Sequence, residues 1–259
     1  MKKSMALLVG VALFTAAAWA QPSVLVSMGT RETGTSAEIG GNGGTANGIE
    51  WVNLDGQTLV LDGTWQLFTF DMDTDPITPF AGGSANGVLG DINGDGVPDV
   101  FTGTIEHIRF RFVDYFQPIT LWIDDVADTI DPPGPPPPTT ITFGTFEGYA
   151  DGTEVMFQEP GFSGSTSGFQ DPAFPDISAI DNTVAHSGTG SLRVEFDWLD
   201  TADPTFWLRL TTYGTNQPQP NPAIRYDQDS VVSFWIRGIP EPTTLLLLGV
   251  PGLALLRRR

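Results

Sequence analysis

The residues best suited to chemistry lie in a short run of alternating oxygen-bearing side chains. Its candidate ligands are Asp91, Asn93, Asp95, Val97 through its carbonyl oxygen, and Asp99. Ca²⁺ binds six to eight hard oxygen atoms, and alternate residues of a tight turn can direct such atoms to one point. Gly96 permits the sharp turn that this arrangement needs. The spacing predicts a calcium loop over residues 91–99, although a metal-free Asp/Asn/Gly-rich turn has a similar composition.

The run differs from an EF-hand loop at one decisive position. An EF-hand has a bidentate glutamate as its twelfth residue, where this chain has Thr102, and no incoming helix is evident. The spacing instead resembles the short loops of FG-GAP-type and thrombospondin type 3 repeats. That resemblance implies a structural calcium ion that holds a long inter-strand loop.

Two segments of alternating polarity place large side chains opposite their apolar positions, namely Trp207, Arg209, Trp235 and Arg237. Flat aromatic rings match the CH-rich faces of sugars, and a guanidinium group can hydrogen-bond to hydroxyls. We therefore expect a carbohydrate-binding face, which Trp122 and Arg109 or Arg111 join if their strands share the sheet. The alternative is that loops bury these faces, because tryptophan is usually largely buried.

Strands must position all of these residues, because runs with a period of two recur and no long helical pattern is present. The clearest runs cover residues 65–72, 105–114, 119–126, 191–199, 206–213 and 230–238. Turns rich in Gly, Asn, Asp and Pro separate them. This organisation predicts an all-β protein, a sandwich or a jelly roll.

A proline-rich run divides the chain into two stretches. Residues 131–138 read DPPGPPPP, which favours extended polyproline II and cannot join a sheet. We expect residues 132–138 to form a semi-rigid linker between one β stretch, 21–131, and another, 139–239.

The two stretches resemble the halves of a carbohydrate-binding-module jelly roll in reversed order. Residues 146–148, 185–198 (with HSGTGSLRV) and 230–238 resemble the first half of such a module, and residues 64–72, 103–112 and 119–126 (ending in IDDV) resemble the second. The resemblance implies one circularly permuted jelly roll, in which the linker joins the old termini. Two separate small sandwiches are the alternative. The same resemblance implies a second calcium site that uses Glu147 with Asp124 or Asp125.

The first twenty residues have the three parts of a secretory signal peptide. Lys2 and Lys3 precede an apolar run over residues 5–18, and small residues, Ala18 and Ala20, occupy the positions that signal peptidase reads. We expect cleavage after residue 20 and export of the rest.

The last twenty residues resemble a PEP-CTERM sorting tail. Pro240, Glu241 and Pro242 precede a leucine-rich segment, and three arginines end the chain. The apolar segment is shorter than the roughly 20 residues that span a bilayer, so we expect only a transient anchor in the inner membrane, with the arginines in the cytoplasm. The resemblance implies a Gram-negative host that makes exopolysaccharide, and processing of residues 240–259 by an exosortase-type enzyme. An ordinary tail anchor is the alternative.

Composition restricts the partners of the exported part. Five of the 12 basic residues lie at the two ends, so seven arginines and no lysine remain against 31 acidic residues. Nucleic acid is excluded as a partner because binding its phosphates needs clustered cations. Cysteine is absent, so no disulfide can stabilise the exported fold.

Catalysis has little support in the sequence. His107 and His186 are the only histidines, and no nucleophile motif or distinct pair of acids accompanies them. We expect a non-catalytic, calcium-binding, carbohydrate-binding protein of the cell surface or extracellular matrix, with an N-terminal signal helix and a C-terminal hydrophobic helix flanking the jelly roll. The alternatives are a structural matrix protein without a ligand and, less favoured, a glycan-active enzyme.

Overall fold

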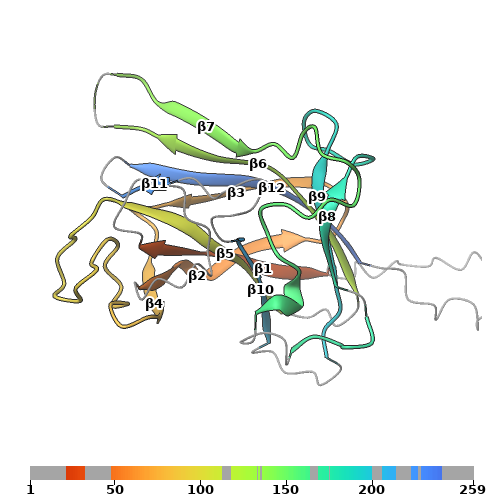
Figure 1. Cartoon of the computed structure of the whole chain (residues 1–259), viewed down its shortest axis with the longest axis horizontal. Coiled ribbons are helices and arrows are strands. Elements are labelled where there is room, and N and C mark those ends of the chain that lie inside the picture. Colours follow the sequence, from red (N-terminus) through yellow and green to blue (C-terminus); the bar gives the residue numbers. More distant parts are fainter. Residues whose placement is uncertain are drawn as a thin grey trace, which may run out of the picture.

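The computed structural model describes residues 22–32, 48–112, 118–132, 134, 136–163, 169–174, 176–199, 206–213, 223–226 and 229–240. These residues form two antiparallel sheets packed as a β-sandwich, which confirms the all-β prediction (Figure 1). The expected signal helix and nearly all of the C-terminal tail, including Ala18, Ala20, Glu241 and Pro242, lie outside the described residues.

The first sheet, called sheet A, has the strand order β10-β5-β1-β2-β4, and β11 pairs with one end of β5. Its strands are β1 (Ser23–Glu32), β2 (Ile49–Val60), β4 (Ile77–Ala81), β5 (Thr102–Phe112), β10 (Trp207–Thr211) and β11 (Ala223–Arg225). Both faces of β1 and β5 are largely buried.

The second sheet, called sheet B, has the strand order β3-β12-β6-β9-β8, and β7 pairs with β6. Its strands are β3 (Trp65–Asp71), β6 (Ile119–Ile130), β7 (Thr139–Gly144), β8 (Ile177–Asp181), β9 (Ser191–Phe196) and β12 (Ser230–Pro240). A short 3₁₀ helix, η1 (Pro160–Phe162), precedes β8 in the chain.

Strands from both sides of the proline-rich run are present in each sheet. In sheet B, β12 from the second stretch lies between β3 and β6 from the first, and in sheet A, β10 from the second stretch pairs with β5. The run itself connects β6 to β7, and Ile130 lies opposite Thr139 across that pair (Figure 1). The proline-rich run therefore lies between two neighbouring antiparallel strands of sheet B.

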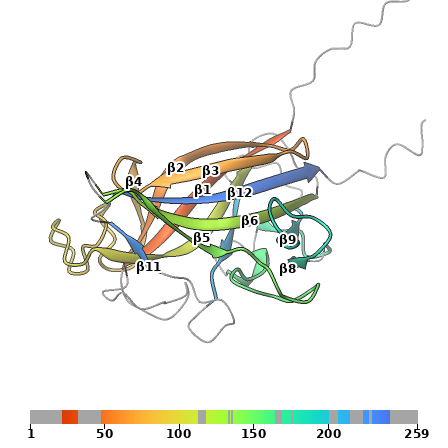
Figure 2. The same ribbon diagram turned by 90° about the horizontal axis from the view of Figure 1, so that it is seen from above.

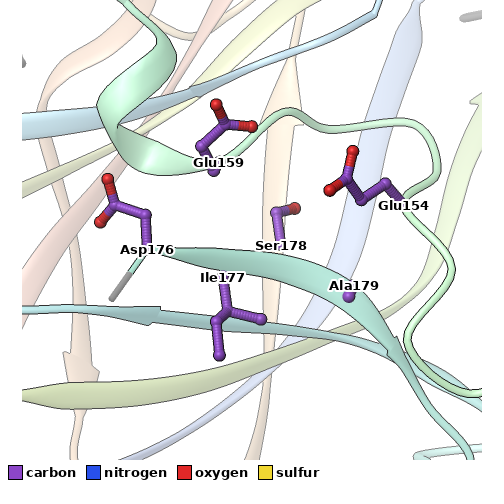
Figure 3. Close-up of a pocket in the computed structure, with 6 residues that line it drawn as sticks. All are labelled: Glu154, Glu159, Asp176, Ile177, Ser178 and Ala179. Carbon is purple, nitrogen blue, oxygen red and sulfur yellow. The ribbon is translucent and has the colours of Figure 1, made fainter. Parts of the chain in front are cut away.

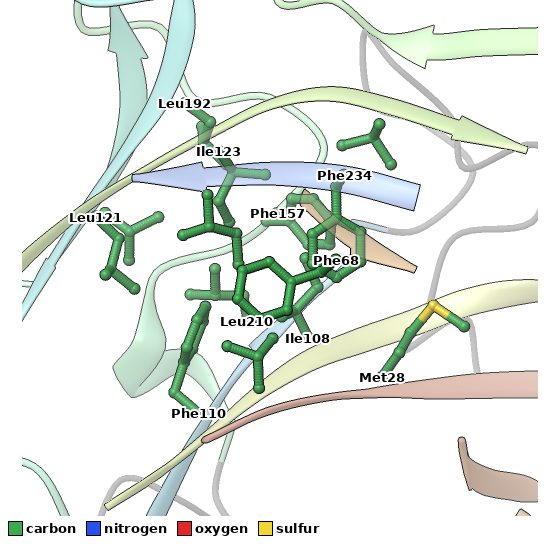
Figure 4. Close-up of a cluster of buried hydrophobic side chains, with 14 of the residues drawn as sticks. Met28, Phe68, Ile108, Phe110, Leu121, Ile123, Phe157, Leu192, Leu210 and Phe234 are labelled. Atoms are coloured by element: carbon green, nitrogen blue, oxygen red, sulfur yellow. The ribbon is translucent and has the colours of Figure 1, made fainter. Parts of the chain in front are cut away.

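Alternating side chains from the two sheets form one hydrophobic core (Figure 4). In β12, Val232, Phe234 and Ile236 point into it, and the ring of Phe234 stacks on Phe70 with the centroids 5.4 Å apart. From sheet A, Ile108 and Phe110 face the same core. This alternation leaves the intervening residues of each strand on the outer face of its sheet.

Candidate functional site

The predicted calcium loop lies at one end of the sandwich, beside β4 and β11 (yellow in Figures 1 and 2). The carboxylate of Asp91 is fully buried and accepts hydrogen bonds from the amides of Gly94 (2.7 Å) and Gly96 (2.6 Å). The side-chain amide of Asn86 donates a further bond of 2.6 Å to it. These hydrogen bonds to Asp91 hold the turn in its conformation. Gly94 and Gly96 have the positive φ that the tight backbone path requires.

The remaining predicted ligands lie on the exposed side of the loop. The carboxylate of Asp99 accepts hydrogen bonds from both the backbone and the side-chain amide of Asn93, at 3.1 and 3.0 Å. Asp95 accepts the amide of Val97 (2.9 Å), and Val97 is 61% exposed. Over the described residues, no three His, Asp or Glu side chains form a group that could hold a metal ion by themselves. Calcium here would therefore also need the amide oxygen of Asn93 and the carbonyl oxygen of Val97.

Two further acids, which the sequence analysis did not single out, lie near the loop. Glu50 and Glu32 are completely buried, and neither carboxylate oxygen of Glu50 has a hydrogen-bond partner among the described residues. Burial and the neighbouring Glu32 raise the pKa of Glu50 to about 8, and burial raises that of Glu32 to about 7. A nearby divalent cation would offset the cost of burying these carboxylates, so the donor chemistry of this end fits calcium.

Three other predicted ligands meet at a single turn. Asp124 Oδ2 accepts the amides of His186 (2.8 Å) and Ser187 (3.1 Å), while Asp125 Oδ1 accepts the hydroxyl of Ser187 (2.7 Å). Glu147 accepts the amide (2.7 Å) and hydroxyl (2.6 Å) of Thr189. The structure thus brings the three carboxylates to the turn over residues 186–190. In the contacts described they are engaged by N–H and O–H donors of that turn.

Local backbone conformation keeps these acids in place. Asp125 has a φ of 49° and Phe146, which precedes Glu147, has a φ of 57°. Positive values of this size are uncommon for residues other than glycine. Asp125 lies in a bulge, because β6 has two residues opposite Phe234 of β12. Burial raises the pKa of Asp124 to about 6, against the opposing effect of the backbone amides of Ser187, His186 and Asp125, which donate to its carboxylate.

The four predicted carbohydrate ligands do not share one surface. Trp207 and Arg209 are on β10 of sheet A, whereas Trp235 and Arg237 are on β12 of sheet B. Each pair points away from the core, so the two pairs lie on opposite outer faces of the sandwich. Trp122 belongs with the sheet B pair, and Arg109 and Arg111 belong with the sheet A pair.

The outer face of sheet B carries a row of alternating aromatic and arginine side chains. Register places Trp65, Arg237, Trp122 and Arg193 directly opposite one another across β3, β12, β6 and β9. The guanidinium of Arg237 lies 5.2 Å from the ring centre of Trp122. The indole N–H of Trp122 donates to Asp181 (2.8 Å), which fixes this buried ring between Arg237 and Arg193. Sequence analysis missed the role of Trp65 because only strand register shows its neighbours.

Trp235 extends this aromatic surface. His186 stacks on Trp235 with the ring centroids 3.9 Å apart and the planes 16° apart, and it also contacts Trp65 at 5.6 Å. Leu67, directly opposite Trp235, is 48% exposed. Because Asp124 and Asp125 hold the turn that carries His186, the carboxylate cluster sets the edge of this aromatic surface.

A different arrangement covers the outer face of sheet A. Trp51 contacts His107 at 4.3 Å and Trp207 at 5.6 Å, with Phe80 packed 4.6 Å from Trp51. Here Trp51 and His107 are buried, whereas Trp207 is half-buried. This face is more enclosed than that of sheet B and carries more arginine.

An acidic pocket of about 510 Å³ lies between η1 and β8, lined by Glu154, Glu159, Asp176, Ile177, Ser178 and Ala179 (Figure 3). Burial and the neighbouring Glu159 raise the pKa of Asp176 to about 6. Glu154 accepts a hydrogen bond from Tyr213 (2.9 Å). None of these six lining residues is aromatic or basic, so the pocket lacks the rings and guanidinium groups that sheet B presents.

Comparison with known proteins identifies no relative. No family model matches the chain, and no curated protein or solved structure is significantly similar to it. Within the described part of the chain, none of the helical structure is long and apolar enough to cross a membrane.

Proposed function

We propose that this chain is an exported, non-catalytic protein of the cell surface or extracellular matrix that binds carbohydrate and uses Ca²⁺ to stabilise its fold. The observation that carries the proposal is the row of Trp65, Arg237, Trp122 and Arg193 on the outer face of sheet B, extended by Trp235. Aromatic faces beside guanidinium groups suit the CH-rich faces and hydroxyls of sugars. The row crosses four strands of one sheet, and its half-buried members, together with Trp235, offer a preformed platform beside the buried Trp122.

Calcium is proposed for the loop of Asp91, Asn93, Asp95, Val97 and Asp99. Hard oxygen donors, the tight turns at Gly94 and Gly96 and the uncompensated carboxylate of Glu50 support this assignment. The ion would supply positive charge and connect the loop to the sandwich. A second calcium site at Glu147, Asp124 and Asp125 is supported by their convergence on residues 186–190.

Export is proposed from the two ends of the chain. The signal peptide with Ala18 and Ala20 would be removed by signal peptidase, and the tail with Pro240, Glu241 and Pro242 would be processed by an exosortase-type enzyme. Pro240 is the last residue of β12, so the motif begins where the sandwich ends. Until processing, the tail would hold the protein at the inner membrane.

The finer fold that we propose is a circularly permuted jelly roll. Each sheet contains strands from both sides of the proline-rich run. The start of the first strand and the end of the last strand both lie beside the turn that follows β2. Leu61 donates its amide to Pro22, and Gly63 donates to Gly238, both at 2.9 Å. Such proximity of the ends is what permutation requires.

Truncation of the two half-buried rings tests the carbohydrate site. Trp65→Ala and Trp235→Ala should each weaken binding to a neutral oligosaccharide by about tenfold or more, because each removes a stacking surface. Isothermal titration measures the affinity. Leu67→Ala is the matched control, since it trims an exposed apolar side chain between the two rings without removing one. Unchanged affinity in both tryptophan variants would refute this placement.

A glycan-cleaving enzyme is the second candidate, favoured by the pocket of Glu154, Glu159 and Asp176. Two carboxyl groups that flank a glycosidic bond can divide acid and base roles when their pKa values differ. Release of reducing sugar that is lost in Asp176→Asn and retained in Trp235→Ala would favour the enzyme over the binding protein.

A further inference from the structure

The outer face of sheet A concentrates the few cations of this acidic protein. The exported part has seven arginines and no lysine, and three of the seven, Arg109, Arg111 and Arg209, lie on this face. Arg109 and Arg111 are on β5 and Arg209 is on β10, alternating with core residues such as Ile108 and Leu210. We refer to these three residues as the arginine cluster.

Strand register places two arginines of the cluster next to each other. Arg209 lies directly opposite Arg109, and Trp207 lies directly opposite Arg111. Like charges that face one another across a strand pair destabilise the sheet. Burial and the charge of Arg111 lower the pKa of Arg109 to about 10, which still leaves it charged at neutral pH.

The hydrogen-bonding capacity of the cluster is only partly used within the described residues. Arg109 donates to the carbonyl of Leu54 (3.2 Å), Arg111 to that of Asp55 (3.4 Å), and Arg209 to the hydroxyl of Ser163 (2.7 Å). The Nε atoms of Arg109 and Arg111 are buried without a hydrogen-bond partner. These contacts are to neutral oxygens, so they orient the guanidinium groups without neutralising them.

Among the described residues, the acid whose charge acts on the cluster is already paired with another arginine. Glu106 is the acid that acts on Arg209, and Arg31 holds both of its oxygens in a bidentate ion pair at 2.8 and 2.9 Å. His107, on the same face, is completely buried, and burial together with Arg209, Arg109 and Arg31 lowers its pKa well below the usual value. This face is thus locally positive in a strongly negative protein.

Aromatic rings enclose the cluster. The guanidinium of Arg109 lies 4.9 Å from the ring centre of Trp51 and 5.2 Å from that of Trp207, and Arg209 lies 5.3 Å from that of Phe80. Stacking of this kind holds a guanidinium plane rigid and leaves its N–H edge available to an anion. Arg109 itself is buried, whereas Arg111, Arg209 and the ring of Trp207 are half-buried and form the accessible part of this face.

We propose that the arginine cluster and Trp207 form a binding site for a sugar that bears a carboxylate, that is, for an acidic polysaccharide. The inference rests on the proposed carbohydrate binding and adds a second face with a different ligand class. A carboxylate accepts paired N–H bonds from guanidinium groups, and the ring that carries it packs on the indole. The sandwich would then bind glycans on two opposite faces and could cross-link chains in a matrix.

The test compares the full exported chain with two matched probes, tetragalacturonate and its methyl ester, which share the sugar ring and differ in charge. Wild type should bind the acid at least about tenfold more tightly than the ester. Raising NaCl from about 20 to about 300 mM should weaken binding of the acid alone. Arg111→Gln and Arg209→Gln should each lose about tenfold in affinity for the acid.

The controls separate this site from sheet B. Arg193→Gln, the same change on the opposite face, and Trp235→Ala should bind tetragalacturonate as wild type does, and near-ultraviolet circular dichroism verifies folding of each variant. Equal affinity of wild type for acid and ester would overturn the inference, whatever the variants do. So would unchanged binding in folded Arg111→Gln and Arg209→Gln. Neutral-glycan binding that depends on Trp235 would survive either result, so the two proposals fail independently.

Discussion

Glu50 is the second residue of β2 and has no exposed surface; it lies opposite Thr30 of β1 and Pro79 of β4. The charged form of such a carboxylate is costly because it has lost water and gained no donor. The nearby amides of Asn86 and Gly87 oppose the rise in its pKa without forming a hydrogen bond of normal geometry. Glu50 therefore binds its proton more tightly in the folded protein than in the unfolded chain.

The sign of the resulting pH dependence follows from linkage. The pKa of Glu50 is raised from 4.5 to about 8 on folding, so its contribution to stability is present below about pH 4.5 and is lost as pH rises through 8. In EDTA, the free energy of unfolding should fall by on the order of 3 kcal/mol over this interval, and Glu50→Gln should remove much of the fall. Urea denaturation at several pH values measures it. Glu154→Gln changes an exposed acid and is the control, so its free energy of unfolding should depend on pH as that of wild type does. If the free energy of unfolding of Glu50→Gln falls with pH in parallel with wild type, Glu50 is not the source of the pH dependence.

Single residues also show the limits of sequence reasoning. The spacing from Asp91 to Asp99 could be interpreted because all of its members lie in one loop. Glu32 and Glu50 could not be found this way, since only the pairing of β1 with β2 and the path of the loop bring them near Asp91. Trp65 was missed for the same reason, because its partners Arg237 and Trp122 are far away in the chain.

At the scale of elements, strands with a clear period of two were the predictable ones, including β5 and β6, both faces of which are largely buried. Buried and half-buried residues alternate along most of β9 and β12, and their boundaries lie within three residues of those expected from the sequence. β1 has no such alternation because both of its faces are largely buried. Its Gly29 lies under the ring of His107, where a Cβ would come within 2.2 Å of the imidazole. That close approach is invisible until β1 and β5 are paired.

The loop over residues 91–99 is the element whose behaviour should change most with calcium. A ligand that binds only the folded protein stabilises it by about 2.7 kcal/mol at a hundredfold excess over its Kd. Calcium should therefore raise the Tm of wild type above its value in EDTA, and Asp95→Asn, which keeps an acceptor for the amide of Val97, should reduce the rise. Differential scanning fluorimetry measures both.

Asp73→Asn is the matched control for the loop, since it makes the same change in an exposed turn after β3. Its response to calcium should equal that of wild type. Identical wild-type Tm values in calcium and EDTA would contradict calcium binding, and equal responses of Asp95→Asn and Asp73→Asn would place the ion elsewhere.

At the scale of the whole molecule, the sandwich presents two outer faces with different chemistry. Sheet B offers the half-buried rings of Trp65 and Trp235 with spaced arginines, whereas sheet A encloses its arginines among rings. The proposed calcium loop lies at one end, and β8 and β9 lie toward the other (Figure 2). The alternation of polar and apolar residues indicates which side chains point outward. It does not indicate which sheet each strand joins, because that depends on the strand order.

Binding of the exported chain to a glycan array, in calcium and again in EDTA, tests the central claim most directly. We predict binding to at least one glycan class in calcium and weaker binding in EDTA, because the ion stabilises the fold that holds the aromatic platform. Binding to no glycan in calcium, by a protein whose circular dichroism shows it to be folded, would contradict the claim. The chain would then be a structural component of the surface matrix without a carbohydrate ligand.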